Sequence, residues 1–181
     1  MAKIIKTTDA TGNQVEKRIV SLNIVERHDV IKYAHNLPST MATFFPFGQF
    51  VDLFEFTDEE QKQYGIRYED GKIVSNAPDL VFDIDITTAP EGIMDAIRLR
   101  VGEYKKEIAR LREANKNIKG YTDSPLLAAI VNTLSKLLTD AEIGEIDVKN
   151  NMKEPSLAER LGEKKPSGNP VFTLIKNGIK K

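Results

Sequence analysis

The apolar residues between Glu91 and Ile118 recur with a spacing that suits only a helix. A series of them is spaced three and four residues apart in alternation, namely Met94, Ile97, Val101, Tyr104, Ile108, Leu111 and, past Asn115, Ile118. A repeat of 3.5 residues places them on one narrow stripe of an α-helix. We therefore expect a long helix that starts near Pro90, with Thr88 as its cap, and ends at Gly120.

A second apolar helix is predicted directly after the first. Asp123 or Ser124 can cap it, Pro125 suits its first turn, and residues 126–142 carry a broad apolar face. Because the connection is short, the two helices should form an antiparallel hairpin. The stripe on the first helix then packs either on the second helix alone or also on a neighbouring copy. In the latter case Tyr104 is an interface residue, and Asn115 helps to fix the register.

The first half of the chain shows the period of two that is typical of strands. Leu80, Phe82, Ile84 and Ile86 alternate with Val81, Asp83 and Asp85, and residues 14–26 alternate in the same way around Val20, Leu22 and Ile24. Turns are expected at 9–13 and at Asp70-Gly71, which suits a type I′ hairpin. Two short helices are predicted, one within residues 28–40 and one capped by Thr57 with Glu60.

Six of the eight phenylalanines lie between positions 44 and 56. Phe44, Phe45 and Phe47 surround Pro46 and Gly48 and are expected in a loop, whereas Phe50, Asp52, Phe54 and Phe56 are expected on one face of a strand. This cluster has two interpretations. It supplies core area, since aromatic rings bury much surface, or its loop part is an interface that a partner covers.

The last twenty residues combine two unlike compositions. Residues 162–181 carry five lysines and one glutamate, with proline and glycine between them, around the uncharged run Val171, Phe172, Thr173, Leu174 and Ile175. A run of β-prone apolar residues presented alone is an aggregation hazard. We therefore expect the run to be a docking strand, held either by its own domain or by another subunit, and we favour pairing with a sheet edge of a partner.

These patterns predict an α+β fold in which a small antiparallel β-rich half is followed by an antiparallel helical hairpin and an extended C-terminal arm. The expected boundaries are 1–88 for the β-rich half and 89–143 for the hairpin, within a globular domain of residues 1–148. The arm is residues 149–181, with a short helix before the docking strand.

The residues that commonly perform catalysis are sparse. The chain has no cysteine, only His28 and His35 as histidines, and no nucleotide-binding, hydrolase or zinc-protease motif, so no cofactor is expected. Asp79, Asp83 and Asp85 could hold Mg²⁺ or Ca²⁺ and serve a metal-dependent hydrolase. We favour the simpler interpretation that they are solvated residues on a strand, and we expect no metal and no enzymatic activity.

Charge is balanced overall, with a net charge of −1. The first long helix and the residues just after it carry eight cations and five acids, so they could lie against phosphates or form internal pairs such as Glu107–Arg110 and Glu103–Lys106. We favour internal pairs. As the alternative function we keep a nucleic-acid-associated accessory protein that uses the basic helix face and the lysine-rich tail. The N-terminus lacks the apolar region of a signal peptide, and residues 36–51 are too short to span a membrane. We expect a soluble protein made in the cytoplasm, with no membrane partner.

The hairpin from Pro90 to Glu142 and the arm from Met152 to Lys181 resemble structural proteins of tailed-bacteriophage virions, namely head-completion, neck-ring and tail-adaptor subunits. The resemblance covers less than half of the chain, and no motif matches residue by residue. It implies a non-enzymatic subunit of a head-to-tail connector or ring, located in the virion after synthesis in the host bacterial cytoplasm. Its partners would be copies of itself and other structural subunits, held by the arm.

Overall fold

The computed structural model describes residues 1–35, 37 and 47–152. Residues 1–150 form one compact unit, to which the description below applies. Its elements in chain order are β1 (Lys3–Thr8), β2 (Gln14–Asn23), α1 (Ile24–Ala34), α3 (Phe47–Asp52), α4 (Asp58–Tyr64), β3 (Arg67–Glu69), β4 (Lys72–Val74), β5 (Val81–Asp85), α5 (Glu91–Ala114), α6 (Pro125–Ser135) and α7 (Asp140–Asn151).

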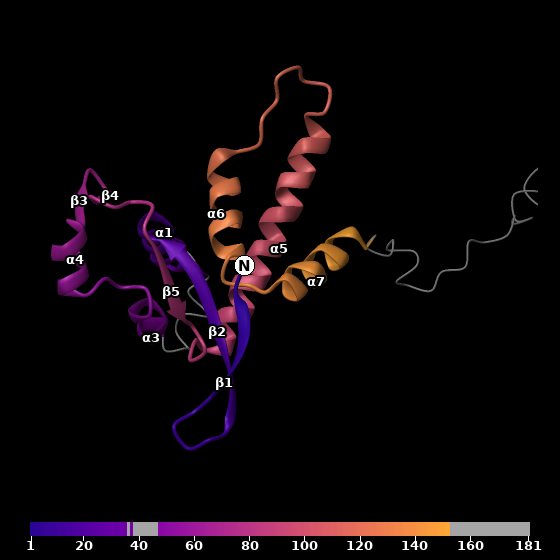
Figure 1. Ribbon diagram of the computed structural model, residues 1–181. Helices are drawn as coiled ribbons and strands as arrows, with labels where there is room; N and C mark the ends of the chain where they lie inside the picture. Colours follow the sequence, from indigo (N-terminus) through magenta and orange to yellow (C-terminus); the bar gives the residue numbers. More distant parts are fainter. Residues whose placement is uncertain (36, 38–46, 153–181) are drawn as a thin grey trace, which may run out of the picture. The chain divides into compact units, whose positions relative to one another are not determined.

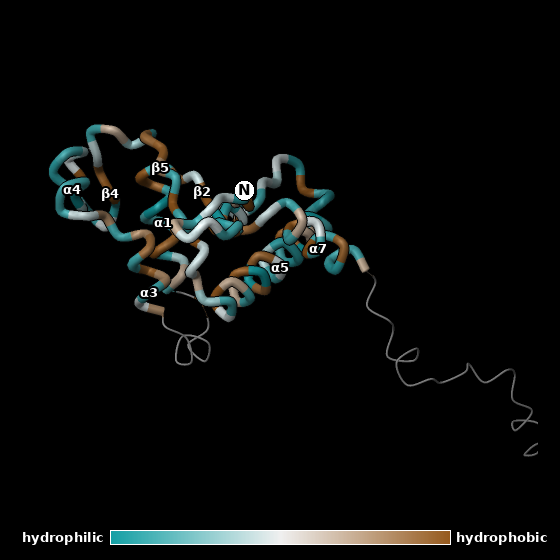
Figure 2. Tube along the Cα trace, turned by 60° about the horizontal axis from the view of Figure 1, so that its bottom comes forward, coloured by the Kyte–Doolittle hydropathy of each residue, from teal (hydrophilic) through white to brown (hydrophobic). Residues whose placement is uncertain are grey.

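The α+β class is confirmed, with two small antiparallel sheets and helices on one side of the larger one. The larger sheet has the order β1-β2-β5, with Val20 opposite Ile84 and Leu22 opposite Phe82. Val20 and Leu22 are fully buried on the face that packs against α5 and α6, as the period of two predicts. Figure 1 shows α5 and α6 as an antiparallel pair, and in Figure 2 hydrophobic and hydrophilic residues alternate along α5.

A second, smaller cluster lies where α1 meets the segment between α3 and β3. It contains Ile24, Phe56 and Ile66. Arg27 is buried beside it, with its guanidinium carbon 4.4 Å from the centre of the Phe56 ring. The same guanidinium donates to the Phe54 carbonyl at 2.8 Å and to a Glu60 carboxylate oxygen at 2.9 Å. One buried cation therefore holds residues 54–57 and the first turn of α4 in place.

The phenylalanine-rich segment differs from its prediction. Residues 47–52 form helix α3, so Phe47 begins a helix and the strand expected over 50–56 is absent. The apolar positions 47, 50, 51 and 54 have the spacing of a helix, and the fully buried Phe50 and Phe54 rings lie 5.2 Å apart. A strand with a period of two would place Asp52 on the buried face. Burying this carboxylate costs free energy, so the helix is the more stable arrangement.

Four predicted ends of elements are also wrong. Strand β2 stops at Asn23 because the Asn23 side chain caps α1 in a capping box with Glu26. Pro90, and not Thr88, occupies the cap position of α5, without a side-chain hydrogen bond. Helix α5 ends at Ala114, so Ile118 lies beyond it and is 58% exposed. The fourth error lies in the second helix.

The second predicted helix is two helices in the structure. α6 ends at Ser135, and α7 begins at Asp140, so the helical part of the chain extends past the expected boundary at 143 to Asn151. Leu137 and Leu138, in the connection, are fully buried. Thr139 and Glu142 form reciprocal hydrogen bonds that start α7, with the Thr139 amide donating to the carboxylate at 2.7 Å. Burial of two adjacent leucines and this new cap together explain the break.

Candidate functional site

The β1–β2 hairpin is closed by a loop whose conformation is fixed by one side chain. The Asp9 carboxylate accepts hydrogen bonds from the Thr11 amide and the Asn13 amide, each at 2.9 Å. Gly12 has a φ of 87°, which a residue with a side chain rarely adopts. The Thr11 hydroxyl donates to the same carboxylate. This hydrogen bond is the largest cause that lowers the pKa of Asp9, and the other hydrogen bonds add to it. The tip of the hairpin is therefore ordered although it is exposed.

The outer edge of β1 has no strand partner in the described part of the chain. The Ala2 amide faces away from β2 and donates to the Leu138 carbonyl at 3.0 Å, whereas the Asp9 amide faces across the hairpin to Asn13 at 2.9 Å. Backbone groups in an antiparallel strand point to alternate sides from one residue to the next. Both observations therefore place the amide and carbonyl groups of Ile4, Lys6 and Thr8 on the outer edge.

Each face of β1 also leaves an isoleucine exposed. Ile4 lies opposite Arg18 and is 48% exposed, and Ile5 lies opposite Lys17 and is 45% exposed. Because side chains alternate along a strand, Ile4 is on the face that continues into the core and Ile5 is on the other face. Strand β5 pairs only with residues 19–23 of β2, so residues 14–18 are paired with β1 alone. The edge thus combines unpaired backbone with apolar surface on both sides.

The base of this hairpin is held by an ionic network. Arg18 of β2 donates to the Leu137 carbonyl at 2.8 Å and to both oxygens of the Glu142 carboxylate. Arg98 of α5 donates from Nε to the same carboxylate at 3.0 Å. Burial favours the neutral form of Glu142, but hydrogen bonds from Arg18 and other donors outweigh it and lower its pKa to about 2. A carboxylate so fully paired joins β2, α5 and α7 and is not a proton donor or acceptor near neutral pH.

A second uncovered surface lies on α6. The helix has the sequence PLLAAIVNTLS, which is apolar almost throughout, yet its buried residues are only Val131, Thr133, Leu134 and Ser135. Leu126 is 62% exposed, and residues 127–130 are half-buried. A helix that is apolar all round is normally covered on all sides. The first half of α6 is therefore a candidate contact surface.

The predicted interface residues fall into two groups. Tyr104 is half-buried against the core cluster, beside Arg100, whose guanidinium carbon is 5.4 Å from its ring. Asn115 is at the end of α5, where its side-chain amide donates to the Leu111 carbonyl at 2.8 Å, so it ends the helix and does not occupy a stripe position within it. Phe47 packs against the core cluster. Val171, Phe172, Leu174, Ile175, Phe44 and Phe45 lie outside the described residues, as does the expected short helix of the arm.

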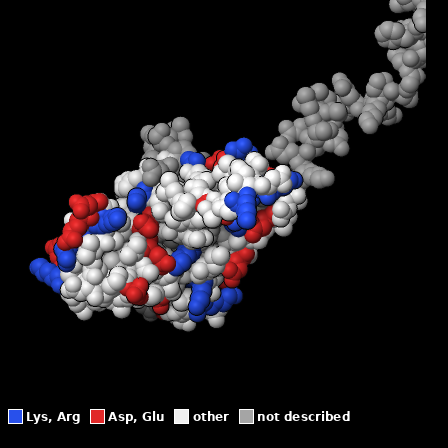
Figure 3. Space-filling view, turned by 90° about the horizontal axis from the view of Figure 1, so that it is seen from above, with Lys and Arg blue, Asp and Glu red and all other residues white. Residues whose placement is uncertain are grey.

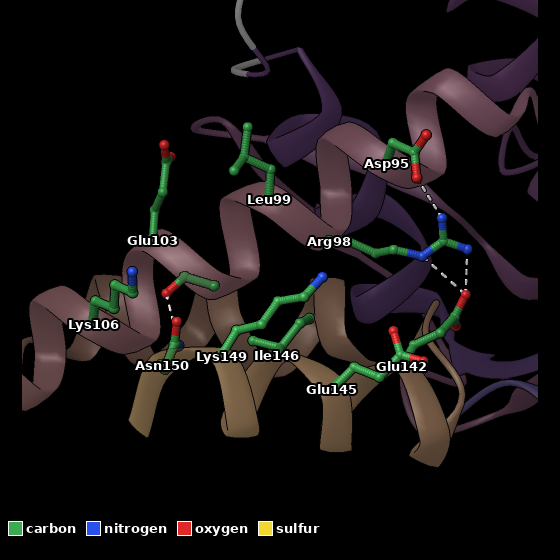
Figure 4. Close-up of a pocket in the computed structure, with 11 residues that line it drawn as sticks. Asp95, Arg98, Leu99, Glu103, Lys106, Glu142, Glu145, Ile146, Lys149 and Asn150 are labelled. Atoms are coloured by element: carbon green, nitrogen blue, oxygen red, sulfur yellow. Dashed lines mark hydrogen bonds and ion pairs between the residues drawn. The ribbon is translucent and has the colours of Figure 1, made fainter. Parts of the chain in front are cut away.

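A cavity of about 350 Å³ lies between α5 and α7 (Figure 4). Figure 4 shows Arg98 directed to Glu142 and Asp95, while Leu99 and Glu103 project away from α7. The Asn150 side chain donates to the Gly102 carbonyl at 3.1 Å, and Lys105 pairs with Asp147 at 2.7 Å. The polar groups around this cavity thus serve mainly to join the two helices.

Both histidines line a cavity of about 640 Å³ between α1 and the β3–β4 hairpin. The His28 ring lies 5.3 Å from the ring of Tyr68, which is 60% exposed. Burial lowers the pKa of His28, and Lys32 adds to this effect while Asp29 opposes it. His28 is therefore neutral at neutral pH. Lys32 and Glu55 both line the cavity, so the charges around it do not favour a ligand of either sign.

Most of the cations on α5 and just after it are paired. Glu107 with Arg110 at 2.7 Å confirms one predicted pair, whereas Glu103 pairs with Arg100 at 3.2 Å and not with Lys106. Six of the eight cations have a carboxylate partner, namely Arg98, Arg100, Lys105, Arg110, Arg112 and Lys116. In Figure 3 positive and negative side chains are interspersed over the visible face. Cations that are already paired with acids leave little positive charge on this helix for binding phosphates.

The aspartates near β5 have local partners. Asp83 accepts a hydrogen bond from the Ser21 hydroxyl at 2.6 Å, and Asp85 pairs with Lys17 at 2.9 Å. The pKa of Asp85 is lowered to about 2, chiefly by its hydrogen bond from the Thr87 hydroxyl. Among the described residues there is no group of three or more histidine, aspartate or glutamate side chains that could hold a metal ion, so Asp79 does not complete a site there.

Comparison with known proteins gave no relative. No family model matches the sequence, and neither a curated protein nor a solved structure matches it. Within residues 1–35, 37 and 47–152, no helix has the length and apolar composition needed to cross a membrane.

Proposed function

We propose that this protein is a non-enzymatic structural subunit of an oligomeric assembly, in which copies contact one another through α6 and hold their neighbours with the C-terminal arm. The observation that carries the proposal is the uncovered first half of α6, where Leu126 is 62% exposed and residues 127–130 are half-buried. Apolar side chains that remain accessible over one turn of a helix can be covered by a partner, although Ile130 of this turn also packs against the core cluster. The run at 171–175 is a second apolar element that needs a partner.

The class of assembly that we propose is a head-to-tail connector or ring of a tailed-bacteriophage virion. A helical hairpin that projects from a small sheet, followed by a lysine-rich arm, supports this class by resemblance of architecture alone. Identical subunits that contact one another through two different surfaces close into a ring when the rotation between neighbours allows it. The alternative, a nucleic-acid-associated accessory protein, has less support because six of the eight cations considered above are paired with acids.

The test is the molar mass in solution of the full chain and of two variants of α6. Leu126→Glu places a charge in the proposed contact, and we expect it to weaken association at least tenfold, since burying an unpaired charge is costly. Asn132→Glu is the matched control, because it adds the same charge at an exposed polar position of the same helix. The proposal fails if the full chain is a monomer at all concentrations, or if Leu126→Glu associates as tightly as the control.

A further inference from the structure

The outer edge of β1 presents six backbone groups without a strand partner in the described part of the chain. They are the amide and carbonyl groups of Ile4, Lys6 and Thr8, placed by the opposite directions of the Ala2 and Asp9 amides. Ile4 and Ile5, on opposite faces, are 48% and 45% exposed. Lys6 pairs with Glu16 at 3.5 Å. A strand that fits this edge must therefore carry apolar residues on both of its own faces.

The run at 171–175 has that composition. In an extended chain Val171, Thr173 and Ile175 lie on one face, and Phe172 and Leu174 lie on the other. Ordinary edge strands alternate apolar with polar residues, but this run carries large apolar side chains on both of its faces. It can cover Ile4 with one face and Ile5 with the other while its backbone pairs with the edge.

We propose that residues 171–175 of one copy add to the outer edge of β1 in a neighbouring copy, as the fourth strand of its sheet. This inference rests on the proposed function, because it supplies the acceptor for the arm. Residues 152–170 lie between α7 and the run. At about 3.3–3.6 Å per extended residue they reach at most roughly 60–70 Å, which exceeds the size of one such domain. A neighbour is therefore within range.

The other strand edges fit the run less well. Strands β3 and β4 have three residues each, which is fewer than the five of the run. The edge of β5 that faces away from β2 has no strand partner among the described residues, and it is flanked by the carboxylates of Asp83 and Asp85. These carboxylates point to one face of the sheet with their partners Ser21 and Lys17. An apolar strand placed there would remove water from those carboxylates at a cost. The charged residues of β1 are Lys3 and Lys6, whose long side chains can keep their ammonium groups in water beside an added strand.

The test uses the absence of cysteine from the chain. The full-length variant Lys6→Cys/Thr173→Cys is treated with a short bismaleimide and run on a denaturing gel. We expect a ladder of covalent multimers. Val81→Cys/Thr173→Cys is the matched control, because Val81 is 57% exposed on the opposite edge strand, and we expect it to remain a single chain.

Other band patterns would overturn the β1 assignment. A ladder from the Val81 variant would place the arm on β5, and a cross-link within one chain would place it on its own sheet. The single variant Lys6→Cys is run beside them, and a dimer from it would indicate that two β1 edges pair together. Light scattering on the same samples separates the two proposals. Assembly without a ladder contradicts docking on β1 but not the assembly role, whereas monomers contradict both.

A backbone variant gives an independent readout. Lys6→Pro removes an outward amide and its ring obstructs an added strand, while the hydrogen bonds between β1 and β2 remain. We expect Lys6→Pro to retain the circular dichroism of the folded chain and to reduce association at least tenfold, with Lys6→Ala unchanged. Equal association of the folded proline and alanine variants would overturn the inference.

Discussion

The guanidinium of Arg18 in β2 donates to both carboxylate oxygens of Glu142 in α7, although the two residues are 124 positions apart. This contact joins the base of the β1–β2 hairpin to the helices and keeps the β1 edge in a fixed place. Arg98 completes the network from α5, so three elements meet at one carboxylate.

Glu142→Gln should destabilise the fold by about 2 kcal/mol, because two arginines lose their shared charged partner in a site where the Glu142 side chain is only 17% exposed. Urea unfolding followed by circular dichroism measures the change. Glu113→Gln is the control, since its pair with Lys116 is exposed and should leave the midpoint unchanged. Equal midpoints for the two variants would show that the network does not stabilise the fold.

Acid should destabilise the protein partly through the same carboxyl. The pKa of Glu142 is lowered from 4.5 to about 2 in the folded state. A lowered pKa means that the stabilisation is fully present above pH 4.5 and is lost as the pH falls towards 2. The free energy of unfolding should therefore fall across this window in the natural chain, and less steeply in Glu142→Gln. Parallel slopes for the two proteins would contradict the assignment.

Arg27→Ala should cost about 3 kcal/mol, because it removes a buried cation and leaves the Phe54 carbonyl and the Glu60 carboxylate without their donor. Arg27→Lys should recover little of this loss, since one ammonium cannot reproduce the forked contacts of a guanidinium. Thermal unfolding of both variants is the measurement. Full recovery by lysine would show that charge alone matters at this position.

Two glycine substitutions should have opposite signs. Gly71 has a φ of 71° in the β3–β4 turn, so Gly71→Ala should destabilise by about 1 kcal/mol through backbone strain alone. Gly144 lies inside α7 with open space around it, so Gly144→Ala should stabilise by about 0.5–1 kcal/mol. If both variants shift the unfolding midpoint in the same direction, the backbone geometry described for Gly71 or for Gly144 is wrong.

Local patterns in the sequence were enough for most of the strands and for their tight turns, but not for the order β1-β2-β5 in which the strands pair. The alternation around Val20 and Ile84 and the Asp70-Gly71 turn depend on neighbours in sequence, and the structure confirms them. The break before α7 could also have been found, because Thr139 and Glu142 have the spacing of a capping box. The segment at 47–54 was misread because its apolar residues fit both periods, and only the cost of burying Asp52 decides between them.

The candidate contact surfaces depended on information that no local pattern holds. Arg18, Arg98 and Glu142 meet only because the sheet and three helices fold together, so their network could not be predicted from spacing. The exposure of Leu126 is equally a tertiary property, since the sequence places Leu126 on the apolar face that was expected to be covered. The sequence did identify the run at 171–175, whose composition requires no tertiary information.

The most direct test of the assembly role is the molar mass, by sedimentation equilibrium, of the full chain and of a chain that ends at Leu161. We predict that the full chain sediments as a multiple of 20.3 kDa, and that the shortened chain is a monomer with the circular dichroism spectrum of a folded α+β protein. A shortened chain that forms the same multiple as the full chain would contradict it.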